Sequence, residues 1–183
     1  MTELTLRLAR PEDTPVLTAL MNAAIAELLR PFLPPEGVEA SFEVMGLDSQ
    51  LIADGTYFVV EDGGEIAGCG GWSRRATLFG GDHSAGRDAA MLDPARDPAR
   101  IRAMYTHPDH VRKGVGRMVL AACEQAAAGE GFTRAEMAAT MGGVPLYEAC
   151  GYTLIEPFTA PTSKGYDVPL ARMGKALGPA PAR

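Results

Sequence analysis

The segment with the clearest chemical character runs from Met104 to Arg117. It contains two glycines, Gly114 and Gly116, at the predicted start of a helix. The first amide groups of a helix carry partial positive charge and have no intrahelical acceptor, and glycine lets an anion approach them closely. The pattern therefore predicts a phosphate-binding site. Three basic side chains flank the glycines in a chain whose formal net charge is -6: Arg112, Lys113 and Arg117.

Two other phosphate-binding patterns fit this chain less well. A P-loop needs Gly-x-x-x-x-Gly-Lys-Ser/Thr, which does not occur in the sequence. A dinucleotide-binding fingerprint would need a third glycine where the chain has Val119, and no helical pattern follows the glycines of residues 68–73. The alternative to a phosphate site is a tight turn surrounded by solvated charges.

The surrounding sequence predicts a mixed arrangement of strands and helices. Helical spacing of apolar residues from Val115 to Ala126, closed by Gly129 and Gly131, predicts the helix behind the phosphate site. Residues 75–100 have no sustained period, so we expect a long loop, with one helical turn at 88–92. The other expected strands are 5–9, 56–60, 66–72 (whose glycines indicate a bulge or a close neighbour), 101–106, 134–138, 152–155 and 166–173, and the other expected helices are 17–28, 42–52 and 144–150.

Length and composition restrict the class of protein. A chain of 183 residues with 46% hydrophobic and 22% charged residues predicts one folded domain, here over 1–176, followed by a flexible tail over 177–183. No apolar run is long enough to cross a bilayer, and no secretory pattern opens the chain, so we expect no membrane partner. The negative charge argues against a nucleic-acid partner. Three cysteines without metal-binding spacing favour a reducing cytoplasm and no bound metal.

Two blocks of sequence, in this order, resemble the GNAT (GCN5-related) N-acetyltransferase family. The block Tyr105-Thr-His-Pro-Asp-His-Val-Arg-Lys-Gly-Val-Gly-Arg-Met-Val-Leu120 looks like the family's motif A, Gln/Arg-x-x-Gly-x-Gly/Ala. The block Pro145-Leu-Tyr-Glu-Ala-Cys-Gly-Tyr152 resembles its later signature, a tyrosine on a short helix before a Gly-aromatic pair. The chain departs from the family at Val111, where Gln or Arg is usual, and at Thr140, where Asn is frequent.

The resemblance implies a single-domain α+β fold. Its central twisted mixed sheet would have about six to seven strands flanked by helices, and acetyl-CoA would lie between two splayed parallel strands, 101–106 and 134–138. Thr140 would replace part of the contact that the usual Asn makes with the pantetheine arm. The resemblance further implies that the backbone of Met104, Tyr105 and Thr106 pairs with this arm and that the pyrophosphate lies on Arg112, Lys113, Gly114, Val115, Gly116 and Arg117.

The resemblance also implies a reaction. An amine of a small molecule attacks the thioester directly, without a metal, and Tyr147 supplies a proton to the leaving thiolate. Two alternatives stay open, namely acetylation of a protein N-terminus or lysine, and a non-catalytic sensor of acyl-CoA. A homodimer is common in the family, but the sequence identifies no interface for one.

The residues around the acceptor are less well defined. We expect residues 75–100 to form a wall of the acceptor site, with Trp72 and Phe79 as an aromatic surface. His107 and His110 lack further metal ligands nearby and are interpreted as solvated, and Cys123 and Cys150 as packing residues. The sequence does not select the base that deprotonates the amine, for which the candidates are Glu61, Asp82, His83 and Glu136.

Overall fold

The computed structural model describes residues 3–179, and its centre is one mixed sheet. In this part of the chain seven strands are hydrogen-bonded in the order β1-β2-β3-β4-β5-β7-β6. Every neighbouring pair is antiparallel except β4 and β5, which are parallel. The predicted α+β fold is therefore confirmed. The strands are β1 (Leu4–Leu8), β2 (Tyr57–Asp62), β3 (Glu65–Ser73), β4 (Ala99–Thr106), β5 (Arg134–Thr140), β6 (Thr153–Ala160) and β7 (Val168–Ala176).

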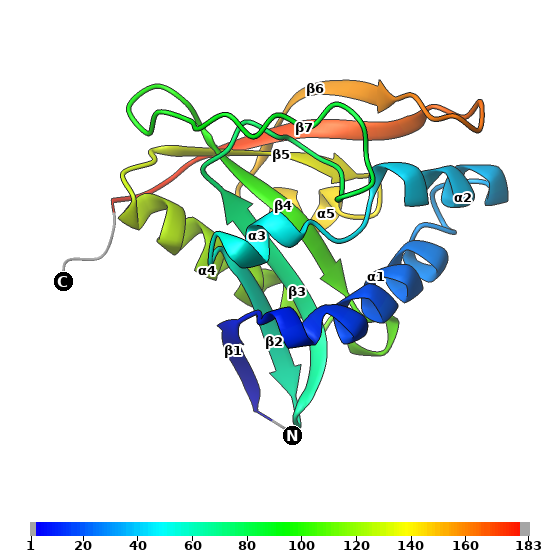
Figure 1. The fold of residues 1–183 in the computed structure, drawn as a ribbon, viewed down its shortest axis with the longest axis horizontal. Helices are drawn as coiled ribbons and strands as arrows, with labels where there is room; N and C mark the ends of the chain where they lie inside the picture. Colours follow the sequence, from blue (N-terminus) through cyan, green and yellow to red (C-terminus); the bar gives the residue numbers. More distant parts are fainter. Residues whose placement is uncertain (1–2, 180–183) are drawn as a thin grey trace.

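Helices cover both faces of this sheet (Figure 1). On one face, α1 (Thr14–Leu28) and α3 (Ser49–Ala53) pack on buried side chains of β2 and β3 such as Tyr57 and Cys69. On the other face, α4 (Val115–Gly129) and α5 (Val144–Ala149) enclose a core that includes Val60, Ile101 and Met137. The remaining helices are α2 (Pro35–Val44), which packs near β7, and two 3-10 turns, Pro11–Asp13 and Pro108–His110.

The predicted helix over 42–52 and the predicted helical turn over 88–92 are both wrong. Instead of one helix over 42–52, α2 begins at Pro35, because proline is well suited to the first turn, and it ends at Val44. α3 begins separately after Asp48, whose side chain accepts a hydrogen bond from the Gln50 amide. Residues 88–92 are extended rather than helical, since they fold back on the start of the loop with a bridge between Arg75 and Met91.

The end of the chain is only partly described. β7 ends at Ala176, and the amide of Leu177 donates a hydrogen bond to the carbonyl of Thr133. Of the tail predicted over 177–183, residues 180–183 lie outside the described residues. In the part of the chain that is described, no helix is long and apolar enough to cross a membrane.

The glycines of β3 allow α4 to lie close to the sheet. A Cβ atom at Gly68 would collide with the Val115 side chain and lie 3.0 Å from the carbonyl oxygen of Tyr105. A Cβ at Gly70 would lie 2.7 Å from a methyl carbon of Val119. The sequence predicted a bulge or a close neighbour at these glycines, and both are present. Val115 and Val119 are the close neighbours, and the pairing of β3 with β4 has a bulge between Cys69 and Gly71. The close approach fixes the position of Val115, the first residue of α4.

We predict that Gly68→Ala lowers the free energy of unfolding by about 1–3 kcal/mol, because the added methyl group must displace Val115 or the backbone of β4. Urea unfolding followed by circular dichroism measures this change. The matched control is Gly129→Ala in the last turn of α4, where a Cβ would meet nothing within 4 Å. The control should be neutral or stabilising by up to about 1 kcal/mol, and equal losses in the two variants would contradict the close-packing argument.

Candidate functional site

The site begins where β4 and β5 separate. Their parallel ladder joins only Ala99 with Ala135 and Arg100 with Glu136. Beyond this point β5 continues along β7, while β4 turns away at Ala103, which has a left-handed φ of 50°. The edge of β4 that faces β5 is consequently open from Ile101 to Thr106. The predicted pair of splayed parallel strands is confirmed.

The turn before α4 has the backbone geometry of an anion site. Arg112 and Gly114 have left-handed φ angles of 64° and 86°, and successive amides in such a turn form a concave group of donors. Gly114 caps α4 without any side-chain hydrogen bond. Among the described residues, none accepts a hydrogen bond from the amides of Gly116 and Arg117. A Cβ at Gly114 would meet nothing within 4 Å, whereas a Cβ at Gly116 would lie 2.8 Å from a methyl carbon of Leu146. Gly114, Val115, Gly116 and Arg117 all line one open cavity.

The basic residues at this turn differ in their surroundings. Arg112 and Arg117 are exposed beside the open amides. Lys113 instead places its ammonium nitrogen 3.5 Å from a carboxylate oxygen of Asp62. His110 lies 3.1 Å from the same oxygen, a contact that the sequence analysis missed because 48 residues separate the two. Within residues 3–179, no group of three or more potential metal ligands is assembled, including around His110.

A cavity of about 740 Å³ extends from this turn to the opening between β4 and β5. One side of it is formed by α1 and the residue that caps its end, with Ala24, Ile25, Leu28 and Leu29 in the lining. The sequence analysis missed these four residues because the spacing that places them toward the cavity is also that of a packed helix. Lys113 does not line the cavity. The other predicted binding residues all do, namely Met104, Tyr105, Thr106, Arg112, Gly114, Val115, Gly116, Arg117 and Thr140, and so does Tyr147.

Tyr147 lies at the far end of this cavity on α5. Its ring packs edge-on against Tyr152, with 6.2 Å between ring centroids, and against Gly143, where a Cβ would lie only 2.8 Å from the ring. No hydrogen bond from a described residue engages its hydroxyl group. Burial raises the pKa of Tyr147 above its usual value of 10, so the phenol keeps its proton at neutral pH. The side chain can therefore donate a proton or a hydrogen bond into the cavity.

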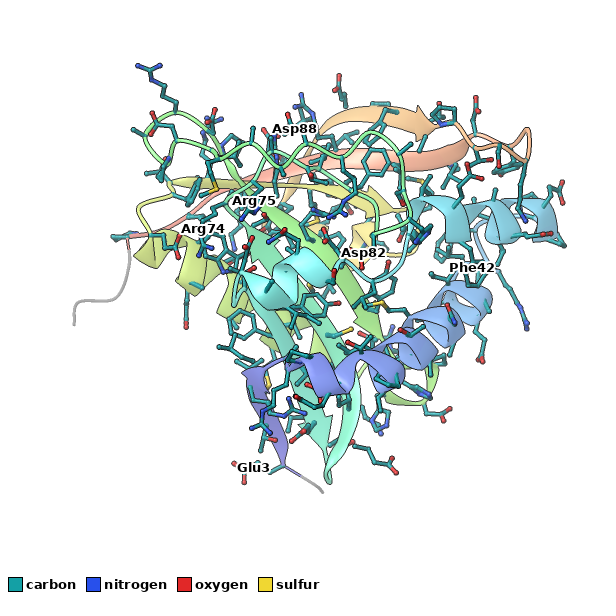
Figure 2. All side chains as sticks on the ribbon, in the orientation of Figure 1. Glu3, Phe42, Arg74, Arg75, Asp82 and Asp88 are labelled. Carbon is teal, nitrogen blue, oxygen red and sulfur yellow. The ribbon has the colours of Figure 1, made fainter. Side chains whose placement is uncertain are left out.

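A second, smaller cavity of about 70 Å³ adjoins the first. The wall contributed by the long loop consists of Leu78, Phe79 and Gly80. Figure 2 labels Arg74 and Arg75 where this loop leaves β3, and Asp82 where the loop passes α3 and accepts hydrogen bonds from Ser49. Five residues line both cavities and mark the junction between them: Met45, Met104, Tyr105, Thr140 and Tyr147.

None of the four candidate bases lines either cavity. Each is held elsewhere by a partner that is remote in sequence, which no local pattern reveals. Glu61 accepts a hydrogen bond from Arg7, Asp82 accepts from Ser49, His83 contacts the carbonyl of Phe42 at 2.7 Å, and Glu136 is paired with Arg100 and Arg172.

Of the two residues predicted to form an aromatic surface beside the loop, Phe79 lies at the site and Trp72 does not. Phe79 lines the small cavity, but Trp72 is only 2% exposed and packs edge-on against Phe132 in the core. Cys123 is buried as predicted, whereas Cys150 is half-buried. The sequence analysis also missed Arg102, which is 3% exposed and lines the small cavity. A charged residue inside a predicted buried strand is the signal that could have indicated it.

Comparisons with known proteins agree with this geometry. The family of acetyltransferases described as "Acetyltransferase (GNAT) family" matches residues 21–152. A relative from Bacillus subtilis, the uncharacterized N-acetyltransferase YsnE, is 28% identical over 130 residues, which are 68% of this chain and 71% of the relative.

Solved structures share the fold. A GCN5-related N-acetyltransferase from Rhodopseudomonas palustris superposes with a TM-score of 0.70 at 21% identity, over 97% of this chain and 98% of the other. A putative acetyltransferase from Salmonella typhimurium, yncA, solved with acetyl-CoA, has a TM-score of 0.64 at 19% identity, over 100% and 98% of the two chains. The PaiA N-acetyltransferase of Thermoplasma acidophilum, solved with coenzyme A, has a TM-score of 0.63 at 11% identity, over 95% and 99%. Because the family match covers most of the sequence and both of its signature blocks, the chain belongs to the GNAT family of acetyltransferases.

Proposed function

We propose that this protein transfers an acetyl group from acetyl-CoA to an amine of a small molecule. The observation that carries the proposal is the unfilled amide turn at Gly114 and its continuity, through one cavity, with the buried phenol of Tyr147. The bound acetyl-CoA and coenzyme A of two structures with the same fold support it.

The cavity offers a separate feature to each part of acetyl-CoA. The pyrophosphate binds the amides of Gly114–Arg117, where the helix dipole and the exposed Arg112 and Arg117 favour negative charge. The pantetheine arm lies along the open edge of β4, where Met104–Thr106 pair with its amide groups as with an added strand. Thr140, across the gap on β5, offers one hydroxyl group to the same arm.

The reaction then takes place at the junction of the two cavities. The amine nitrogen attacks the thioester carbonyl carbon, a C–N bond forms, and the C–S bond breaks. Tyr147 donates its proton to the departing sulfur and is reprotonated from solvent. The proton of the amine leaves through water, since no carboxylate or imidazole of the described residues lines the small cavity.

The dimensions of the small cavity favour a small acceptor over a folded protein substrate. Its volume is about 70 Å³, and the loop around Phe79 forms one side. The cytoplasm is the compartment that fits the chain, because Cys69, Cys123 and Cys150 are all free thiols.

Gly114→Glu is predicted to abolish acetyl-CoA binding, because it adds a side chain and a negative charge in front of the open amides. Calorimetry measures the affinity. The matched control is Gly64→Glu in the turn between β2 and β3, where φ is +89° and a Cβ also meets nothing within 4 Å. The control carries the same charge and similar backbone strain, so it should keep the wild-type affinity. Unchanged affinity in Gly114→Glu would refute the anion site.

Tyr147→Phe is predicted to lower kcat by about 100-fold, in the range of general acid catalysis, and to leave the affinity for acetyl-CoA within about twofold. A thiol-release assay gives kcat, and calorimetry gives the affinity. Tyr152→Phe removes a hydroxyl group from the neighbouring ring and should keep the wild-type kcat. Equal rates in Tyr147→Phe and the wild type would remove Tyr147 from the mechanism.

The pH profile gives an independent check of Tyr147. Burial raises the pKa of this group, so the proton-donating form persists as pH rises and is lost only above its usual value of 10. We therefore expect kcat to rise or stay level from pH 6 to about pH 10. A decline between pH 8 and 9 that Tyr147→Phe abolishes would show that the phenol ionises early, against this assignment.

A further inference from the structure

Among the described residues, Arg102 is the one charged residue that lines the small cavity. The other described residues of the lining are apolar or are neutral polar residues such as Thr140, Tyr105 and Tyr147. The formal charge of the whole chain is -6, which would favour a cationic acceptor, but the cavity has the opposite sign. Local charge determines what binds in a desolvated space, because solvent screens the distant surface charges.

The positive charge of Arg102 is only partly balanced. Its Nη2 atom lies 3.0 Å from one carboxylate oxygen of Asp48, and Arg87 Nη2 lies 2.5 Å from the other oxygen. One buried carboxylate thus serves two guanidinium groups. Asp82 lies 3.6 Å from Arg87 and has a side chain 46% exposed, so water screens its contribution.

Neighbouring charges do not supply the missing negative charge. On the same strand, Arg100 is paired with Glu136. Arg172 contacts Glu136 and also Glu156, whose side chain is 58% exposed, so the half-buried Glu136 likewise serves two guanidinium groups. Of these two clusters, the one with Arg102 is the one that lines the small cavity.

Hydrogen bonds hold the guanidinium of Arg102 in position and leave two of its N–H groups without an acceptor among the described residues. A guanidinium has five N–H groups. Nη2 bonds Asp48 and the carbonyl of Gly80 at 2.6 Å, and Nη1 bonds the carbonyl of Thr77 at 3.3 Å. These contacts use three of the five. Burial lowers the pKa of Arg102 and Asp48 opposes that shift, so the group stays cationic at neutral pH.

We infer that the acceptor carries a carboxylate beside its amine, as a small amino acid does, and that Arg102 binds this carboxylate. Arg102 and Met104, which lies at the junction, line the same cavity of about 70 Å³, so the space favours an acceptor whose two groups are a few bonds apart. Such a ligand adds the missing negative charge and accepts the remaining N–H groups. The inference rests on the proposed acetyl transfer and assigns the class of its acceptor.

The test compares matched acceptors with the full-length protein and acetyl-CoA. We use three sets of acceptors: short L-amino acids, their carboxamides and their decarboxylated amines. Across the three sets the side chain stays constant and only the anionic group varies. We expect kcat/KM to be about 10- to 100-fold higher for the free acids, as for hydrogen bonds to a charged group.

A double variant, Arg102→Gln with Asp48→Asn, removes one charge of each sign, and Asn can still cap α3. It should reduce the preference for free acids to less than about threefold through a higher KM for the acid, with acetyl-CoA affinity unchanged by calorimetry. Arg100→Gln on the same strand does not touch the cavity and should keep the preference.

The outcomes separate this inference from the transfer on which it rests. Carboxamides or decarboxylated amines that react as well as the acids would overturn the carboxylate assignment and leave acetyl transfer intact. Retention of the full preference in the double variant would overturn the role of Arg102. Acetyl-CoA binding without reaction on any of the three sets would overturn the acceptor class, and it would overturn acetyl transfer as well if a wider panel of small amines also failed to react.

Discussion

The site depends on the short pairing of β4 with β5. Two parallel strands that stayed paired would satisfy each other's backbone groups and leave no room between them. Here the ladder ends at Arg100 and Glu136, and the left-handed Ala103 directs β4 away while β7 retains β5. The antiparallel pairing of β3 with β4 continues to Thr106, so the separation costs hydrogen bonds on one edge only. An extended ligand arm can supply the missing partners along that edge.

The other features place charge along this opening. At one end, α4 presents amides without acceptors, and the glycines of β3 hold the first turn of that helix close to the sheet. At the other end, the phenol of Tyr147 keeps its proton because it is buried. Arg102 adds a fixed cation behind the junction. The two adjoining cavities of this acidic chain thus have amide donors at one end and Arg102 at the other, which suits the pyrophosphate of acetyl-CoA at the first and the carboxylate proposed for the acceptor at the second.

The sequence predicted the features that depend on local chemistry. The glycines of residues 114–116 and the helix behind them were predictable because turns and helix starts follow from neighbouring residue types. The break between α2 and α3 was not, since Pro35 fits both a turn and a first helical turn. Three features depend on contacts between residues far apart in the sequence. They are the pairing of residues 88–92 with the start of their own loop, the buried ion pair of Arg102 with Asp48, and the position of every candidate base outside the cavities. No local pattern carries that information.

The central claim is that the amides at the start of α4 hold the pyrophosphate of acetyl-CoA, and amide chemical shifts test it most directly. We propose to titrate isotopically labelled protein with coenzyme A and, separately, with pantetheine, which lacks the pyrophosphate. The account predicts that the amides of Gly114, Val115, Gly116 and Arg117 shift with coenzyme A and not with pantetheine, while those of Met104–Thr106 shift with both. Coenzyme A binding that leaves the resonances of Gly114–Arg117 unchanged would contradict it.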